Sequence, residues 1–255
     1  MTAEPDVTLT QDHFLGGRVR LWQPVAGYRA GVDPVLLAAA CAARSGQAVL
    51  ELGCGAGAAL CCLGARVGGL RLDGLEIQPD YAALARRNLS ENALTGTVFE
   101  GDVAVPPAAV RQVSYDHVIA NPPYFEASKG LAAQDAGRDT GRAGAVPLAD
   151  WLGLAARRLK PGGFATVIQR VERLPELMAA FDAVLGSLEL MPLIPREGRG
   201  PRLILLRGRK DGRAPFRFHP GPIMHPGAAH GFDGEGYTLL FEAIFRDAAS
   251  LPFPE

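Results

Sequence analysis

Two short motifs of this 255-residue chain have the residue types and spacing of a chemical site. In ELGCGAG, Glu51 stands two residues before the first of three alternating glycines, Gly53, Gly55 and Gly57. Glycines at such positions let the backbone turn tightly and let a ligand approach it closely. The spacing differs from the GxGxxG of dinucleotide sites, and the acid repels phosphate but attracts a cation such as an α-amino group. The motif therefore predicts a site for the amino-acid end of S-adenosylmethionine.

Two further acids end the next two predicted strands. Glu76, followed by Ile77, ends the second strand, and Asp102, followed by Val103, ends the third. The first is placed to accept hydrogen bonds from ribose hydroxyls, and the second can accept one from an adenine amino group. Each acid alone is more simply explained as a helix cap or a solvated loop residue, since charged residues are mostly exposed. Together with the glycine motif, they predict a nucleoside-type cofactor site that includes Ile77 and Val103.

The second motif, Asn121-Pro122-Pro123-Tyr124, follows the apolar segment YDHVIA. The prolines fix φ and lack N–H groups, which leaves their carbonyls as pure acceptors beside the Asn121 amide oxygen. Convergent acceptors suit an –NH₂ group, and Tyr124 offers a flat face on which an aromatic base can stack. Hydrogen bonds from both N–H groups localise the nitrogen lone pair for in-line attack on a sulfonium methyl group. We therefore predict that this motif is catalytic and that Asn121 also lies against the cofactor.

Short apolar strands and amphipathic helices alternate around these motifs. The predicted strands are residues 47–52, 70–77, 97–103, 115–120, 164–169, 188–194 and 202–208. This alternation predicts an α/β fold, a mostly parallel sheet with helices on both faces. The last two strands are too close for a helical crossover and should be antiparallel. Because parallel strands end at the same edge, the acids and the Asn121 motif should meet there.

The remaining sequence predicts one domain with a short tail. Residues 1–12 are expected to form a mobile tail and residues 13–255 a single domain. Its predicted parts are an N-terminal hairpin and helix (13–46), the core sheet (47–208), and a loop with a C-terminal helix (209–255).

Composition indicates an ordinary globular protein, with 48% hydrophobic residues and a net charge of -1. Cys41, Cys54, Cys61 and Cys62 form no CxxC pair, which fits a reducing cytoplasm rather than a disulfide framework. No apolar run reaches the roughly 18 residues of a membrane span, and the N-terminus lacks the apolar core of a secretory signal. The histidines near the C-terminus match no zinc spacing. We expect a cytoplasmic protein without a metal or a membrane partner.

Basic residues cluster between residues 196 and 217, where eight arginines and lysines accompany two acids. On a chain with so small a net charge, this clustering predicts a local phosphate-binding surface for RNA. A solvated arginine-rich loop is the plainer alternative. The residues predicted to contact RNA are Arg138, Arg142, Arg199, Arg202, Arg209 and Lys210.

The two motifs and the acid at the end of the second strand resemble those of class I methyltransferases that act on exocyclic or amide nitrogens. Over nearly the whole chain, the sequence further resembles the bacterial tRNA1(Val) (adenine37-N6)-methyltransferase family. The segments that carry this likeness are FLGGRVRLWQP (14–24), GYRAGVD (27–33), Leu36-Leu37, REGRGPR (196–202) and Arg209-Lys210.

The resemblance implies S-adenosylmethionine as cofactor, tRNA as partner, and methylation of N6 of the adenine next to the anticodon. It also implies a Rossmann-like sheet of seven strands in the order 3-2-1-4-5-7-6, with the seventh strand antiparallel. Residues 27–33 would pack over the methionine end of the cofactor. We expect a monomer or a weak homodimer.

Three alternatives stay open at this point. A protein glutamine-N5 methyltransferase can share the Asn121 motif, although only about 45 residues precede the glycine motif where such enzymes carry a helical domain. An rRNA guanine-N2 methyltransferase is weakly disfavoured by Tyr124, where those enzymes often have Phe. A catalytically silent RNA-binding module is disfavoured by the intact Asn121 and glycines.

Overall fold

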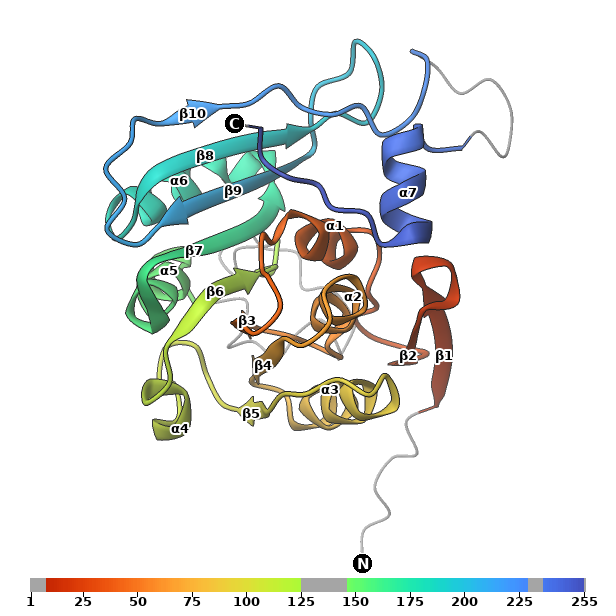
Figure 1. Ribbon diagram of the computed structural model, residues 1–255, viewed down its shortest axis with the longest axis vertical. Helices are drawn as coiled ribbons and strands as arrows, with labels where there is room; N and C mark the ends of the chain where they lie inside the picture. Colours follow the sequence, from red (N-terminus) through yellow and green to blue (C-terminus); the bar gives the residue numbers. More distant parts are fainter. Residues whose placement is uncertain (1–7, 125–145, 229–235, 255) are drawn as a thin grey trace, which may run out of the picture.

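An eight-stranded sheet forms the centre of the molecule (Figure 1). The computed structural model describes residues 8–124, 146–228 and 236–254. The strands of the sheet are β3 (Ala48–Leu52), β4 (Arg71–Glu76), β5 (Val98–Glu100), β6 (Tyr115–Ala120), β7 (Leu159–Arg170), β8 (Gly186–Leu193), β9 (Leu203–Arg209) and β10 (Arg217–Phe218). They confirm the predicted α/β fold.

The strands lie in the order β10-β8-β9-β7-β6-β3-β4-β5. Counted from β3, the first seven strands follow the expected order 3-2-1-4-5-7-6. Strand β9 is antiparallel to both β7 and β8, as predicted. The sheet is one strand larger than expected, because β10 adds a two-residue parallel pairing to β8. The sequence of β10 is too short to show a strand period.

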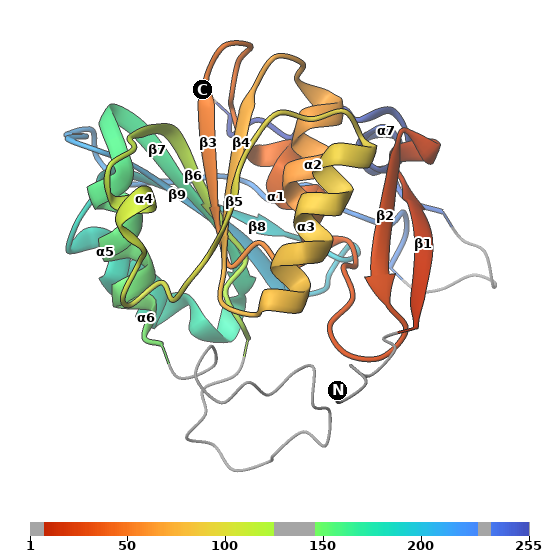
Figure 2. The same ribbon diagram turned by 90° about the horizontal axis from the view of Figure 1, so that it is seen from below.

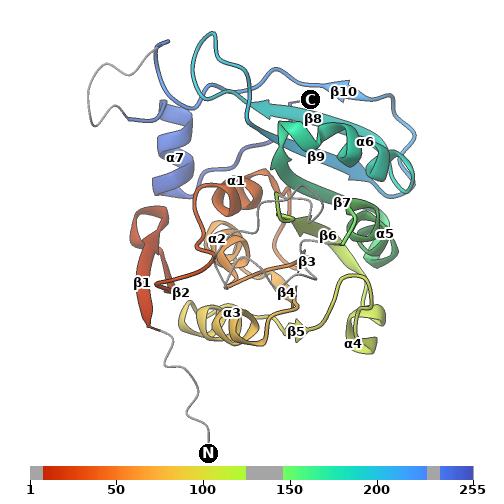
Figure 3. The ribbon, with the colours of Figure 1, turned by 180° about the vertical axis from the view of Figure 1, so that it is seen from behind.

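Helices cover both faces of the sheet (Figures 2 and 3). The helices are α1 (Asp33–Ala40), α2 (Ala58–Arg66), α3 (Pro79–Glu91), α4 (Ala108–Arg111), α5 (Leu148–Arg158), α6 (Leu174–Asp182) and α7 (Leu239–Asp247). Helices α1, α2, α3 and α7 contribute to one apolar core cluster, and α4, α5 and α6 contribute to the other. Neighbouring residues of β3 face opposite clusters, Val49 the first and Leu50 the second, as the alternation of a strand requires. None of the described helices is long and apolar enough to cross a membrane.

A separate hairpin, β1 (Leu9–Phe14) and β2 (Val19–Pro24), packs against α3. The fully buried Asn88 bonds the Trp22 backbone in both directions, at 2.8 and 3.0 Å, and donates to the Ala56 carbonyl oxygen at 2.8 Å. One side chain therefore joins the hairpin to the glycine loop. Residues 9–12 belong to β1, so the predicted tail of residues 1–12 is too long. The strand is mostly polar, so its sequence gives little sign of the pairing with β2.

A buried ionic cluster holds the added edge strand in place. Glu189 on β8 is 4% exposed and contacts Arg207, Arg217 and His219, each at 2.8 Å. Burial alone would raise the pKa of Glu189, but hydrogen bonds from His219 and Arg207, with the charges of Arg207 and Arg217, hold it below the ordinary 4.5. Two arginines of the basic stretch are therefore already paired within the fold.

Replacing Glu189 tests this cluster. Glu189→Gln should lower the free energy of unfolding at pH 7 by roughly 3 kcal/mol, because it leaves the cationic partners uncompensated. Since the folded-state pKa is depressed, this stability is present above the unfolded pKa and is lost as pH falls through the folded value. The difference between wild type and variant in urea unfolding should therefore shrink below about pH 4.5.

Glu242→Gln is the matched control, since Glu242 forms an exposed pair with Arg246 at 2.9 Å. It should cost less than about 1 kcal/mol. Equal losses in the two variants would show that the Glu189 cluster does not stabilise the edge of the sheet.

Candidate active site

The parallel register brings the predicted site residues to one edge of the sheet. Leu52 at the end of β3 pairs with Leu75 of β4 on one side and with Ala120 of β6 on the other. Glu76 therefore follows directly on one flank of the glycine loop and Asn121 on the other. This arrangement was predicted from the strand ends alone.

The glycine loop between β3 and α2 uses backbone conformations that other residues avoid. Gly53, Gly55 and Gly57 have φ of 63°, 53° and 81°. A Cβ atom on Gly53 would lie 2.7 Å from Cη2 of Trp151, so only glycine fits there. Gly57 is the residue before α2, which directs the first free N–H groups of that helix toward the loop.

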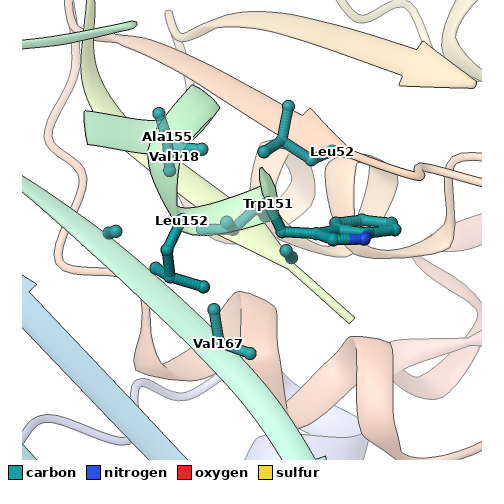
Figure 4. A pocket seen from close by; sticks show the side chains of 9 residues that line it. Leu52, Val118, Trp151, Leu152, Ala155 and Val167 are labelled. Atoms are coloured by element: carbon teal, nitrogen blue, oxygen red, sulfur yellow. The ribbon is translucent and has the colours of Figure 1, made fainter. Parts of the chain in front are cut away.

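Trp151 on α5 packs in the core beside Leu52 (Figure 4), and its ring also reaches Gly53 of the glycine loop. It is 5% exposed, and its indole Nε1 has no hydrogen-bond partner among the described residues. A small cavity beneath it is lined by apolar side chains, among them Leu52, Val118 and Val167, and is a gap in packing rather than a ligand site. No sequence signal separated Trp151 from other core positions of its helix.

Two buried oxygen atoms at this edge have no hydrogen-bond donor in the described part of the chain: Oε2 of Glu51 and Oδ1 of Asn121. Glu51 is 3% exposed, and burial raises the pKa of its carboxyl group well above the ordinary value, with the Glu76 charge adding to the effect. Buried acceptors left unpaired are costly. Each of these two oxygen atoms can therefore accept a hydrogen bond from a ligand.

Glu76 ends β4, as predicted, whereas Asp102 lies two residues beyond the end of β5, which is shorter than the predicted strand. Both carboxylates also organise their own loops. The Glu76 carboxylate accepts from the Gly55 N–H at 2.8 Å and from the Gln78 N–H at 2.9 Å. Burial raises the pKa of Glu76 against the opposing effect of these donors. Asp102 accepts from the Ala104 N–H at 2.8 Å. Both carboxylates keep further lone pairs for a ligand.

Tyr28, in the segment 27–33, lies against the glycine loop. The Tyr28 ring is 3.7 Å from the place of a Cβ on Gly55. Burial of the Tyr28 hydroxyl group, with the nearby charges of Asp33 and Glu51, raises its pKa. The same hydroxyl group shares a hydrogen bond with the side chain of Asn121. The Tyr124 hydroxyl donates to the Asp33 carboxylate. The segment therefore touches both sequence motifs.

The predicted RNA-contacting residues do not form one patch. Arg199 and Arg202 are exposed near the carboxyl edge, where the Arg202 carbonyl oxygen accepts from the Val171 N–H at 3.0 Å. Arg209 pairs with Phe164 of β7, which pairs in turn with His117 near the start of β6, and Lys210 donates to the Leu159 carbonyl oxygen at 2.8 Å. These two lie at the opposite edge, since β9 runs from one edge to the other. Arg138 and Arg142 lie outside the described residues.

Known proteins resemble this chain in sequence and in fold. Residues 31–140 match the methyltransferase small domain family model. The crystal structure of a predicted O-methyltransferase from Agrobacterium tumefaciens superposes with a TM-score of 0.70 at 27% identity, covering 88% of this chain and 100% of that one. The chain has the fold of class I methyltransferases, the enzymes that take their methyl group from S-adenosylmethionine.

Relatives similar over most of their length are tRNA1(Val) (adenine(37)-N6)-methyltransferases. The protein of that name from Porphyromonas gingivalis is 28% identical over 92% of this chain and 95% of its own length. Its counterpart from Haemophilus influenzae is 25% identical over 72% of this chain and 78% of its own.

Across the described residues, no group of three or more His, Cys, Asp or Glu side chains is arranged to hold a metal ion.

The glycine loop can be tested by adding a single methyl group. Gly53→Ala should cost roughly 1–2 kcal/mol of backbone strain, and its contact with Trp151 should cost more. We expect the dissociation constant for S-adenosylmethionine, measured by calorimetry, to rise at least about tenfold, or 1.4 kcal/mol.

Gly46→Ala is the matched control, because Gly46 has a φ of 85° but no atom within 4 Å of the added Cβ. It should show the strain in thermal unfolding while keeping cofactor affinity. Wild-type affinity in Gly53→Ala would remove the loop from the cofactor site.

Proposed function

We propose that this enzyme methylates the N6 amino group of an adenine in tRNA, at position 37 next to the anticodon. The observation that carries the proposal is the buried, unpaired Asn121 Oδ1, which lies beside the glycine loop at the end of β6. The names of the relatives that align over most of the chain support the choice of substrate. The remaining site residues take roles that fit this reaction.

The cofactor residues divide by the chemistry of their partners. Glu51 and the loop of Gly53, Gly55 and Gly57 suit the amino-acid end, since the unpaired Glu51 oxygen lacks a cationic donor. We assign Glu76 to the ribose hydroxyls and Asp102 to the adenine amino group, with Ile77 and Val103 beside them. When bound, S-adenosylmethionine supplies an electrophilic methyl group on sulfur.

The acceptor site binds and orients the target amine. Asn121 Oδ1 and the Pro122 carbonyl oxygen accept its two N–H groups, which localises the nitrogen lone pair. The Pro122 oxygen already accepts from Gln169 Nε2 at 3.2 Å and keeps a second lone pair. The Arg170 guanidinium lies 4.9 Å from the centre of the Tyr124 ring, so we place the target base against the opposite ring face.

Two other groups that could receive the methyl group are compared with adenine. A substrate hydroxyl group, which the name of the Agrobacterium protein would suggest, carries one hydrogen, so either Asn121 Oδ1 or the Pro122 carbonyl oxygen would stay unpaired. A glutamine amide carries two hydrogens and fits the same acceptors. The names of the relatives favour adenine over glutamine.

The assay is methyl transfer to total tRNA followed by nucleoside analysis. Wild type should form N6-methyladenosine, and Asn121→Ala should lower kcat at least about 100-fold, because it removes a transition-state acceptor. Cofactor affinity of the variant should stay within about threefold of wild type. A product other than N6-methyladenosine, or methylated glutamine in a release factor, would overturn the substrate assignment. Lost cofactor binding would mean that Asn121 is misassigned.

We also propose that RNA phosphates contact Arg199 and Arg202, which lie at the edge that carries Asn121. Both side chains are exposed, and the strand register places Leu203 of β9 beside Arg170 at the end of β7. Arg209 and Lys210 donate to the Gly162 and Leu159 carbonyl oxygens at the other edge. These hydrogen bonds within the fold explain the two side chains without an RNA contact.

Neutralising these arginines should weaken RNA binding by the same amount whatever the RNA sequence, because phosphate contacts do not read bases. Arg199→Ala and Arg202→Ala should each reduce the slope of log K against log salt by about 1. Arg213→Ala is the control, an exposed arginine near the opposite edge, and should leave the slope unchanged. Loss of affinity only when Arg209 and Lys210 are neutralised would place the RNA along the other edge.

A further inference from the structure

The Asn121-Pro122-Pro123-Tyr124 motif is held by donors from another part of the chain. Pro122 and Pro123 carry no N–H groups, so the tetrapeptide cannot be fixed by the backbone pairing that holds a strand. The donors to Pro122 and Pro123 lie instead at the end of β7 and in η3 (Val171–Arg173), which follow one another in the chain.

Gln169 is the first of these donors. It is fully buried on β7, and its Nε2 donates to the Pro122 carbonyl oxygen at 3.2 Å. Its Oε1 accepts from the Arg170 N–H at 2.8 Å, so the side-chain amide has a fixed orientation. A hydrogen bond between buried groups restricts the proline carbonyl more strongly than water would.

Arg173 is the second donor. Its Nη1 donates to the Pro123 carbonyl oxygen at 2.8 Å, while Nε and Nη2 make a two-pronged contact with Glu176 at 3.1 and 2.7 Å. The side chain is only 13% exposed. The Glu176 carboxylate also accepts from the Leu148 N–H at 3.3 Å, which ties the arrangement to the start of α5. The guanidinium is therefore held in one geometry from both sides.

The third contact lies on Tyr124. Arg170 covers one face of the ring at 4.9 Å, and Asp33 accepts the hydrogen bond of the hydroxyl group. Every residue of the motif after Asn121 thus has a defined partner. Asn121 Oδ1 is the acceptor left without one in the described part of the chain.

We propose that Gln169 and Arg173 are positioning residues, which fix the Pro122 and Pro123 carbonyls so that Asn121 Oδ1 faces the target amine. Neither residue touches the reacting atoms. Their effect is to keep the acceptors within the small tolerance that an oriented reaction requires. The inference rests on the proposed function, because it concerns the acceptor site of that reaction.

The test compares variants of the full-length enzyme in methyl transfer to tRNA. Gln169→Leu and Arg173→Ala should lower kcat at least about tenfold, because misplacement by a fraction of an ångström is costly in an oriented reaction. KM for tRNA and the dissociation constant for S-adenosylmethionine should stay within about threefold of wild type. Arg173→Lys keeps the charge beside Glu176 and one donor, and should recover part of kcat.

Arg158→Ala is the matched control for stability. The Arg158 guanidinium donates to backbone carbonyl oxygens of Val110 and Arg111 at the end of α4 and of Val113 in the turn before β6. It therefore supports the opposite end of the strand that carries Asn121. The control should lower the melting temperature without lowering kcat.

The outcomes separate the two proposals. If kcat of Gln169→Leu and Arg173→Ala equals that of Arg158→Ala, the positioning role is wrong, and a rise in KM alone would also contradict it. If wild type does not methylate tRNA adenine, the proposed function fails. The same variants are then measured on the acceptor that wild type does methylate, where an unchanged kcat would overturn the positioning role independently.

Discussion

The parallel register of β3 between β4 and β6 is the constraint on which the whole site depends. It places the ends of three strands side by side, so that each strand delivers its next residues to the same edge. A slip of one residue would turn every side chain of β3 to the other face of the sheet. The alternation of Val49 and Leu50 between two apolar clusters opposes such a slip. The energy of the core therefore sets the geometry of the site.

Around this edge the fold tolerates groups that a purely structural protein would pair. The unpaired oxygens of Glu51 and Asn121 and the unpaired nitrogen of Trp151 are all buried near the glycine loop in the described part of the chain. By contrast, the buried carboxylate of Glu189 is paired by two arginines and a histidine. This contrast within one sheet distinguishes a site prepared for a ligand from an ionic cluster that holds a strand.

The rigidity of the Asn121 motif has two sources. Proline removes conformational freedom within the tetrapeptide, which is a local effect. The direction in which the rigid unit points is set by Asp33 on one side and by Arg170 and Arg173 on the other. Because Asp33 belongs to the segment that also covers the glycine loop, the cofactor and acceptor motifs share a neighbour. That shared contact makes the N-terminal segment part of the site rather than an appendage.

What the sequence determined by itself was local. Each motif indicates its chemistry through a few neighbouring residues: alternating glycines, acids at strand ends, and acceptors stiffened by proline. The periods of strands and helices predicted the sheet. The tertiary structure alone decided which distant groups meet them. It brought Trp151 to Gly53, and Gln169 and Arg173 to the proline carbonyls. It also divided a basic stretch continuous in sequence, because β9 carries Arg202 and Arg209 to opposite edges of the sheet. Charge clustering along a chain says nothing about direction in space, and a strand of seven residues is long enough to separate its two ends by roughly 20 Å.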